Sequence, residues 1–181
     1  MSARKQIEYA DPVQSDRPLS PAEWNLRREV TGWVSRRFTA TGRPIVAMTL
    51  TCKRAMPNGM GGLEWLTPAM LSSELSAYFR RIDWAVYKNA SRRGKKCIDR
   101  FCCIEGGNRT GKRIHVHALL LAPPNRYMCL VKFMRQLKDQ WVRSKWSMDD
   151  VNFNLPYSVE ATVLYLTKTG LDSIDLKNTE L

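Results

Sequence analysis

Residues 97–121 read CIDRFCCIEGGNRTGKRIHVHALLL, with two apolar segments on either side of a glycine-rich turn. The flanking segments, residues 97–105 and 113–121, contain β-branched, aromatic and aliphatic side chains, a composition typical of β-strands. The seven residues between them include three glycines, which favour a tight reversal of the chain. We therefore predict a β-hairpin in which these two strands pair in antiparallel fashion.

The chain before this hairpin predicts one strand and one long helix. Residues 44–53 read PIVAMTLTCK, an apolar and β-branched run typical of a buried strand. Thr67 and Pro68 then form a helix-start signal, and the following residues carry an apolar stripe at helical spacing. This helix ends in a basic turn at residues 91–96.

The chain after the hairpin predicts a helix, a short strand and a last helix. Pro123 and Pro124 end the strand. An amphipathic helix follows, with its apolar side chains on one face and basic side chains opposite. The apolar residues are Leu130, Phe133, Met134, Leu137 and Trp141, and the basic ones are Lys132, Arg135, Lys138 and Arg143. A short strand at 151–154 precedes a helix at 158–169, which Gly170 closes.

This order of elements predicts an α+β fold. It matches the split βαβ (ferredoxin- or RRM-like) arrangement, an antiparallel sheet with helices on one face, plus an N-terminal helix. We expect residues 1–19 to form a mobile arm, residues 20–43 the N-terminal helix and residues 44–181 the main domain. Ser20-Pro21-Ala22-Glu23 has the residues of a capping box and begins the first helix. Trp24, Val30, Trp33, Val34 and Phe38 are its expected apolar stripe.

Charge and composition indicate a folded protein with a polyanionic partner. The 29 Lys and Arg residues exceed the 17 Asp and Glu residues, for a formal net charge of +12. The 44% hydrophobic residues argue against a disordered polycation, so nucleic acid is the favoured partner. We expect no membrane association and a cytoplasmic location, because the sequence contains neither a long apolar segment nor a signal-peptide pattern. The five cysteines show no Cys-x-x-Cys pair and are expected to be reduced and mostly buried.

The two histidines of the chain predict a metal site. His115 and His117 lie two residues apart on a predicted strand, so their side chains share a face. The hairpin brings Glu105 opposite them, and two imidazoles with one carboxylate suit Mg²⁺ or Mn²⁺, with Zn²⁺ also allowed. The alternative is a solvated strand face on which Glu105 pairs with basic residues of the turn.

The last predicted helix carries a candidate nucleophile. Tyr165 and Lys168 lie three residues apart and share a face, while Val159, Val163 and Leu166 point inward. A nucleophilic phenolate needs a nearby cation, and Lys168 is placed to supply it. The alternative is an ordinary half-buried tyrosine beside a solvated lysine.

Three motifs together resemble those of the HUH endonuclease superfamily, in particular the single-tyrosine rolling-circle replication initiators of phages and plasmids. AMTLT at 47–51 resembles the first motif, a strand that ends in threonines. IHVH at 114–117 resembles the second motif, and YLTK at 165–168 resembles the third. The tyrosine follows the histidine pair, whereas in mobilisation relaxases it usually precedes the pair. This order favours a replication initiator.

The resemblance implies a nuclease domain at residues 44–181 with a divalent cofactor, Mg²⁺ or Mn²⁺. Its ligands would be His115, His117 and a third polar residue, which we assign to Glu105. Thr49 and Thr51 of the first motif would contact DNA. Further contacts are expected from the basic residues Lys53, Arg54, Arg109, Lys112 and Arg113.

The resemblance also implies a covalent mechanism. Tyr165 would attack single-stranded DNA to leave a 5′-phosphotyrosine bond and a free 3′-OH, and Lys168 would stabilise charge. Such a protein nicks and rejoins single-stranded or hairpin origin DNA to initiate rolling-circle replication of a phage or plasmid in the bacterial cytoplasm. A host helicase and polymerase would be its partners. An HUH transposase-type nuclease is an alternative with the same chemistry.

Two other classes remain open. Split βαβ sheets also serve as non-catalytic platforms for single-stranded nucleic acid, which stack bases on exposed aromatic residues. A metal-dependent hydrolase without a covalent tyrosine step is a further alternative. Two tryptophans, Trp65 and Trp84, are candidates for base stacking, although a place in the core is the expected one for both. Surface charges that could neutralise phosphates also gather in the basic turn at Arg92, Arg93, Lys95 and Lys96.

Overall fold

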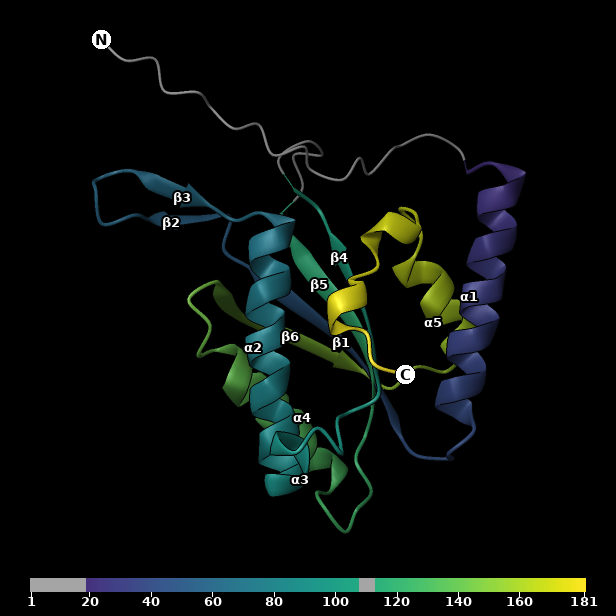
Figure 1. Ribbon diagram of the computed structural model, residues 1–181. Coiled ribbons are helices and arrows are strands. Elements are labelled where there is room, and N and C mark those ends of the chain that lie inside the picture. The colour runs from purple at the N-terminus through teal and green to yellow at the C-terminus, as the bar shows by residue number, and fades with distance from the viewer. Residues whose placement is uncertain (1–18, 108–112) are drawn as a thin grey trace.

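The computed structural model describes residues 19–107 and 113–181 and is built on one four-stranded antiparallel sheet (Figure 1). The strand order is β4-β5-β1-β6, and every neighbouring pair is antiparallel. The strands are β1 (Ile45–Cys52), β4 (Arg100–Glu105), β5 (His115–Leu121) and β6 (Ser147–Asn154). The hairpin predicted from residues 97–121 is therefore confirmed as β4 and β5.

The chain order of the elements confirms the split βαβ fold. A helix, α2 (Pro68–Tyr87), connects β1 to β4, and α4 (Leu130–Trp141) connects β5 to β6. The second strand of the hairpin, β5, lies between β1 and β4, which is the inserted strand that gives this fold its name. The sheet and its two crossover helices thus agree with the α+β class predicted from the sequence.

The two crossover helices cover one face of the sheet. Side chains alternate between the faces along each strand, so Val46, Met48 and Leu50 of β1 all point into the same core. They pack there against α2 and α4, for example against Leu75 and Phe133. This core contains most of the buried apolar residues of the protein.

The opposite face is covered by α1 (Pro21–Thr39) and α5 (Val159–Leu166), which lie side by side (Figure 1). Their apolar side chains pack on Phe101, Cys103, Leu119 and Leu121 of the sheet. The N-terminal helix therefore belongs to the same packed unit as the sheet. The sequence predicted that the helices after the first would pack on one face of the sheet. In the structure, α2 and α4 cover one face, whereas α5 packs on the other face together with α1.

The first two long helices begin at the predicted caps. The Ser20 side chain accepts a hydrogen bond from the Glu23 amide, and the Glu23 carboxylate accepts one from the Ser20 amide. This reciprocal pair confirms the capping box. The Thr67 hydroxyl accepts a hydrogen bond from the Met70 amide and caps α2 in the same way.

The apolar stripe predicted for α1 is partly wrong. Val34 and Phe38 are buried as expected, but Trp24 and Trp33 are exposed. The buried face of the helix instead includes the polar residues Arg27 and Thr31, which follow the same helical spacing as Val34 and Phe38. Two other tryptophans, Trp65 and Trp84, are 47% and 48% exposed, so the expectation that they belong to the core is also wrong.

Several short elements were not predicted. Residues 58–62, expected as a flexible loop, connect β2 (Ala55–Pro57) to β3 (Leu63–Trp65) in a hairpin that projects from the end of β1 (Figure 1). A short helix, α3 (Asn89–Arg92), follows α2. Two 3₁₀ helices, η2 (Leu171–Ser173) and η3 (Leu176–Asn178), lie near the C-terminus. Strand β6 is also longer than predicted, and α5 is shorter.

The C-terminal segment protects the outer edge of β4. Isolated bridges join Cys103 to Ile174 and Arg100 to Glu180. The Asp175 amide also donates a hydrogen bond to the carbonyl oxygen of Cys102. The segment therefore covers backbone groups of an edge strand that would otherwise be open to another chain.

Some predictions fall outside the described residues. The N-terminal arm at 1–19 lies there apart from its last residue, as do Arg109 and Lys112 of the hairpin turn. All five cysteines have free thiols; Cys52, Cys102 and Cys103 are buried, and Cys97 and Cys129 are exposed. Within the described part of the chain, none of the helices combines the length and the apolar character that a membrane crossing needs.

Candidate metal centre

The register of three strands brings the predicted ligands to one end of the sheet. Glu105 of β4 pairs with His115 of β5, which in turn pairs with Thr51 of β1. Two residues further along β5, His117 pairs with Thr49. Because side chains alternate along a strand, all five point to the face that α1 and α5 cover.

The ligand atoms of Glu105, His115 and His117 surround one small space. Oε2 of Glu105 lies 3.4 Å from Nε2 of His115 and 3.6 Å from Nε2 of His117. One ligand atom from each residue lies within 4.8 Å of the other two. The two imidazole rings pack edge to face, with 4.7 Å between their centres. These three side chains, called the metal triad below, could hold one metal ion.

Hydrogen bonds behind the two histidines fix which nitrogen faces the triad. Nδ1 of His115 lies 3.0 Å from the carbonyl oxygen of Arg113, and a carbonyl can only accept, so Nδ1 carries a proton. Nδ1 of His117 lies 3.0 Å from the Thr49 hydroxyl. In the neutral ring of His115, Nε2 then keeps its lone pair and points at Glu105. Partners of this kind orient metal-binding histidines in general.

Two buried polar atoms of the triad lack a hydrogen-bond partner among the described residues. They are Oε1 of Glu105 and Nε2 of His117, and the two residues are only 4% and 7% exposed. A buried carboxylate oxygen without a partner is costly, and so is a buried imidazole nitrogen. A metal ion would satisfy both, so the donor set and its environment fit a divalent cation.

The electrostatics of the site keep Glu105 ionised. Burial favours the neutral carboxyl, but the close contacts with His115, His117 and Lys168 outweigh it and lower the pKa of Glu105 well below its usual range. The same contact with Glu105 raises the pKa of His115. A proton on His115 and a metal ion would therefore compete for the same place beside Glu105.

Tyr165 and Lys168 stand next to the triad. The Tyr165 ring meets the His117 ring edge to face, with 5.9 Å between their centres, and Tyr165 remains 56% exposed. Nζ of Lys168 lies 2.9 Å from Oε2 of Glu105 and 3.9 Å from the centre of the Tyr165 ring. The structure thus brings together the five residues that the sequence selected for catalysis and metal binding; their roles stay predictions.

Helix α5, which carries Tyr165, is held at both of its faces. The Ser158 hydroxyl caps its first turn, and Val159, Val163 and Leu166 pack on the sheet. On the other side, the buried Arg27 of α1 donates hydrogen bonds to the Leu164 carbonyl and, at 3.0 Å, to the Thr167 hydroxyl. Sequence reasoning missed Arg27, because 140 positions separate it from Thr167 and no local pattern marks it.

A glycine directly after Glu105 allows the chain to leave β4. Gly106 adopts a positive φ of 91°, and a Cβ atom there would lie 2.4 Å from the carbonyl oxygen of Arg113. That is the carbonyl that holds His115. A side chain at this position would therefore disturb two members of the triad together.

The predicted DNA-contacting residues are found in different environments. The Thr49 hydroxyl is engaged with His117, whereas Thr51 is half-buried. Lys53 donates to the carbonyl of Lys145, and the Arg54 guanidinium lies 5.6 Å from the centre of the exposed Trp65 ring. The exposed Arg113 contacts the Met148 sulfur.

Comparisons of the chain with models of protein families, with curated proteins and with solved structures find no match.

Proposed function

We propose that the protein cuts and rejoins single-stranded DNA through a covalent tyrosine intermediate. The observation that carries this proposal is the position of Tyr165, whose exposed ring packs on a ligand of the metal triad. A nucleophile beside a site suited to a divalent cation is the arrangement that phosphoryl transfer to tyrosine needs.

Glu105, His115 and His117 would hold the cofactor, Mg²⁺ or Mn²⁺. When bound, a divalent ion polarises the phosphoryl oxygens and offsets the charge that develops on them. Thr49 and the carbonyl of Arg113 orient the two imidazoles for this task. Glu105 supplies the anionic ligand, which its contacts keep ionised.

The proposed reaction exchanges one phosphodiester for another. The Tyr165 oxygen forms a bond to phosphorus, and the bond between phosphorus and the 3′-oxygen breaks. The tyrosine proton leaves to solvent, which the half-exposed side chain can reach, and the 3′-oxygen takes a proton from solvent. Because a phosphodiester replaces a phosphodiester, attack by a 3′-OH reverses the step and rejoins the strand without ATP.

Lys168 acts as a fixed cation in this scheme. Burial favours its neutral form, but contacts with Glu105 and Tyr165 outweigh that effect and raise its pKa. Lys168 therefore stays protonated and is a poor acceptor for the tyrosine proton. Its ammonium group instead stabilises the anionic Glu105 and lies close enough to the Tyr165 ring to offset negative charge that develops in the reaction.

The resemblance to HUH nucleases gives this chemistry a biological setting. The proposed role is initiation of rolling-circle replication of a phage or plasmid at a single-stranded or hairpin origin in the bacterial cytoplasm, with a host helicase and polymerase as partners. A transposase of the same superfamily would use the same residues. A non-catalytic RRM-like binder fits less well, because α5 packs on the sheet face that such modules leave open for bases.

The test is the formation of a covalent adduct. A pool of random-sequence single-stranded DNA with a fluorescent label at the 3′ end is incubated with the protein and Mn²⁺. The label should then appear on the protein in a denaturing gel, because the fragment that keeps its 5′-phosphate on tyrosine also keeps the 3′ end. EDTA should abolish the labelled band.

Tyr165→Phe is the decisive variant, and Tyr157→Phe is its matched control. Tyr157 lies just before α5 and is fully exposed, so both variants remove one phenol from the same region. The labelled band should vanish only with Tyr165→Phe. A band that persists in that variant, or one that never forms with the wild type, rejects the covalent mechanism.

A further inference from the structure

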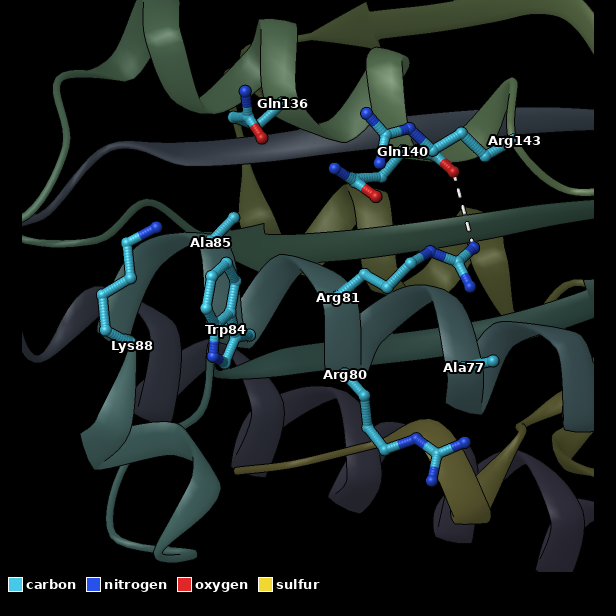
Figure 2. Close-up of a pocket in the computed structure, with 9 residues that line it drawn as sticks. All are labelled: Ala77, Arg80, Arg81, Trp84, Ala85, Lys88, Gln136, Gln140 and Arg143. Atoms are coloured by element: carbon cyan, nitrogen blue, oxygen red, sulfur yellow. Dashed lines mark hydrogen bonds between the residues drawn. The ribbon is translucent and has the colours of Figure 1, made fainter.

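The face of the molecule away from the metal triad carries a basic groove. It lies between α2 and α4 and encloses about 510 Å³ (Figure 2). Its positive side chains are Arg80 and Arg81 of α2, Lys88 directly after α2, and Arg143 two residues after the end of α4. No carboxylate is among its lining residues. The ion pairs of the described residues all lie elsewhere, so these cations have no acidic partner within residues 19–107 and 113–181.

An exposed tryptophan lies within this row of charges. Trp84 is 48% exposed, and Nζ of Lys88 lies 4.3 Å from the centre of its ring. Arg80, Trp84 and Lys88 follow one another at four-residue steps, so they are spaced about 6 Å apart along the helix axis. A cation, an aromatic ring and a second cation thus follow one another along α2 and its C-cap, where the cations could contact phosphates and the ring could stack on a base.

The groove also contains hydrogen-bonding groups without a partner among the described residues. Oε1 of Gln140 is one, on a residue that is only 9% exposed, and Nε of Arg81 is another. Figure 2 shows both side chains in the space between the two helices, where Arg81 also approaches the Gln140 main-chain carbonyl oxygen at 3.5 Å. An unpaired donor and an unpaired acceptor are typical of a surface that binds a polar ligand.

The backbone at the end of the groove is strained. Lys88 has φ 52° and ψ −127°, a conformation that glycine adopts readily and other residues avoid. Strain of this kind is found more often at functional sites than elsewhere. The turn that follows continues the positive charge with the exposed residues Arg92, Arg93, Lys95 and Lys96.

We propose that the groove between α2 and α4 is a second binding site for single-stranded nucleic acid. Its cations contact phosphates, and Trp84 stacks on a base. The site is separate from the metal triad, because α2 and α4 cover the opposite face of the sheet. The proposal does not depend on the nicking activity, since it concerns binding without cleavage. In a protein that cuts DNA, such a site would bind a different strand, or a different part of the strand, from the one bound at the metal triad.

Binding of fluorescein-labelled dT20 to the full-length protein in EDTA tests this inference. The triple variant Arg80→Gln, Lys88→Gln, Arg143→Gln removes three groove charges that lie at the surface. The control Arg28→Gln, Arg36→Gln, Lys177→Gln removes three exposed charges outside the groove. Anisotropy titrations should show at least tenfold weaker binding for the groove variant only. The slope of log K against log salt should fall by about 2 for three lost phosphate contacts.

Two further variants distinguish a loss of contacts with DNA from a loss of folding stability. Trp84→Ala should weaken dT20 binding about fivefold or more without a change in salt slope, because stacking releases no counterions. Lys88→Gly suits the backbone conformation at that position, so it should weaken binding while the melting temperature stays the same or rises. Photo-crosslinking with iodouracil-substituted dT20 should label the peptide that contains Trp84.

Several results would overturn the inference. One is a groove variant that binds dT20 as tightly as the control variant does. Another is crosslinking confined to peptides around the metal triad. A third is displacement of dT20 by poly-glutamate at equal charge concentration, which would identify the groove as a surface for acidic proteins.

Discussion

At the scale of single residues, the metal triad depends on side chains behind its ligands. Thr49 holds the Nδ1 side of His117, and the Arg113 carbonyl holds that of His115. These contacts leave Nε2 of each ring to face Glu105. The geometry of the site is therefore set by the register of β1 and β5 as much as by the ligands themselves.

Thr49→Val should weaken metal binding. Valine keeps the β-branched shape of threonine but cannot hydrogen-bond His117, and loss of such a partner typically lowers metal affinity about 10- to 100-fold. Thr51→Val is the matched control, because Thr51 lies on the same strand and no hydrogen bond of its side chain is observed. Calorimetric titration with Mn²⁺ checks this. Equal affinities for the two variants would contradict the orienting role of Thr49.

Metal affinity should fall as the pH is lowered. The contact with Glu105 raises the pKa of His115 above its usual value of about 6.5, so a proton competes with the metal for this side chain increasingly as the pH falls. In the metal-free protein, the ion pair of protonated His115 with Glu105 stabilises the fold below the unfolded pKa. This contribution is lost as the pH rises through the folded pKa. Mn²⁺ titrations from about pH 8 to about pH 6 should show this loss of affinity. An affinity that stays constant over this range would exclude His115 as a ligand.

At the scale of elements, α1 acts as a support for α5. Arg27 reaches from α1 to the end of α5, and Val34 and Phe38 fill the same core as Val159 and Val163. Since Tyr165 lies on the last turn of α5, its position beside His117 depends on this packing.

Arg27→Met should separate nicking from metal binding. Methionine keeps the apolar stem of the side chain but removes its hydrogen bonds to Thr167 and Leu164, at a cost of about 1–3 kcal/mol in stability. We expect slower adduct formation at unchanged Mn²⁺ affinity, because the ligands lie on other elements. Arg28→Met, at an exposed neighbouring position, should behave as the wild type. If Arg27→Met leaves the rate of adduct formation intact, α1 does not position the tyrosine.

At the scale of the whole molecule, a buried ion pair joins the sheet to its surroundings. Arg100 of β4 and Asp83 of α2 lie 3.0 Å apart, and each side chain is 8% exposed. Asp83 also accepts a hydrogen bond from the Ile98 amide, and Arg100 donates one to the Asn178 carbonyl. One pair thus connects a crossover helix, an edge strand and the C-terminal segment.

Asp83→Asn should destabilise the fold strongly. Removing this charge leaves the buried guanidinium of Arg100 with only the half-exposed Glu180, at 3.8 Å, as an anionic partner. Breaking a buried ion pair typically costs about 3–5 kcal/mol. Asp99→Asn is the control, because its pairs with Arg37 and Arg43 are more exposed and should contribute about 1 kcal/mol or less. Urea unfolding measures both. Equal losses in the two variants would contradict the structural role of the buried pair.

Short-range sequence patterns correctly predicted those parts of the fold that depend on the spacing of neighbouring residues along a strand, a helix or a turn. The spacing of His115 and His117 gave their common face, and the glycine-rich turn placed Glu105 opposite them. The inward stripe of Val159, Val163 and Leu166 was correct for the same reason, since helical spacing alone determines it.

Contacts between distant segments could not be predicted from one sequence. The bonds of Arg27 to α5 and the pairing of residues 174 and 180 with β4 join segments without a shared pattern. The exposure of Trp84 depends on how far α2 and α4 lie apart, which hydrophobicity does not encode. The position of Tyr165 was suggested by its motif, but its contact with His117 required the packing of α5 on the sheet.

Mass spectrometry can detect directly whether Tyr165 becomes covalently attached to DNA. The wild-type protein is incubated with single-stranded DNA and Mn²⁺, the bound DNA is digested with nuclease, and the tryptic peptides are sequenced. We expect a nucleotide linked through its 5′-phosphate to Tyr165 and to no other residue. Cleavage of the DNA with no nucleotide detected on Tyr165, or a nucleotide on another side chain, would contradict this expectation.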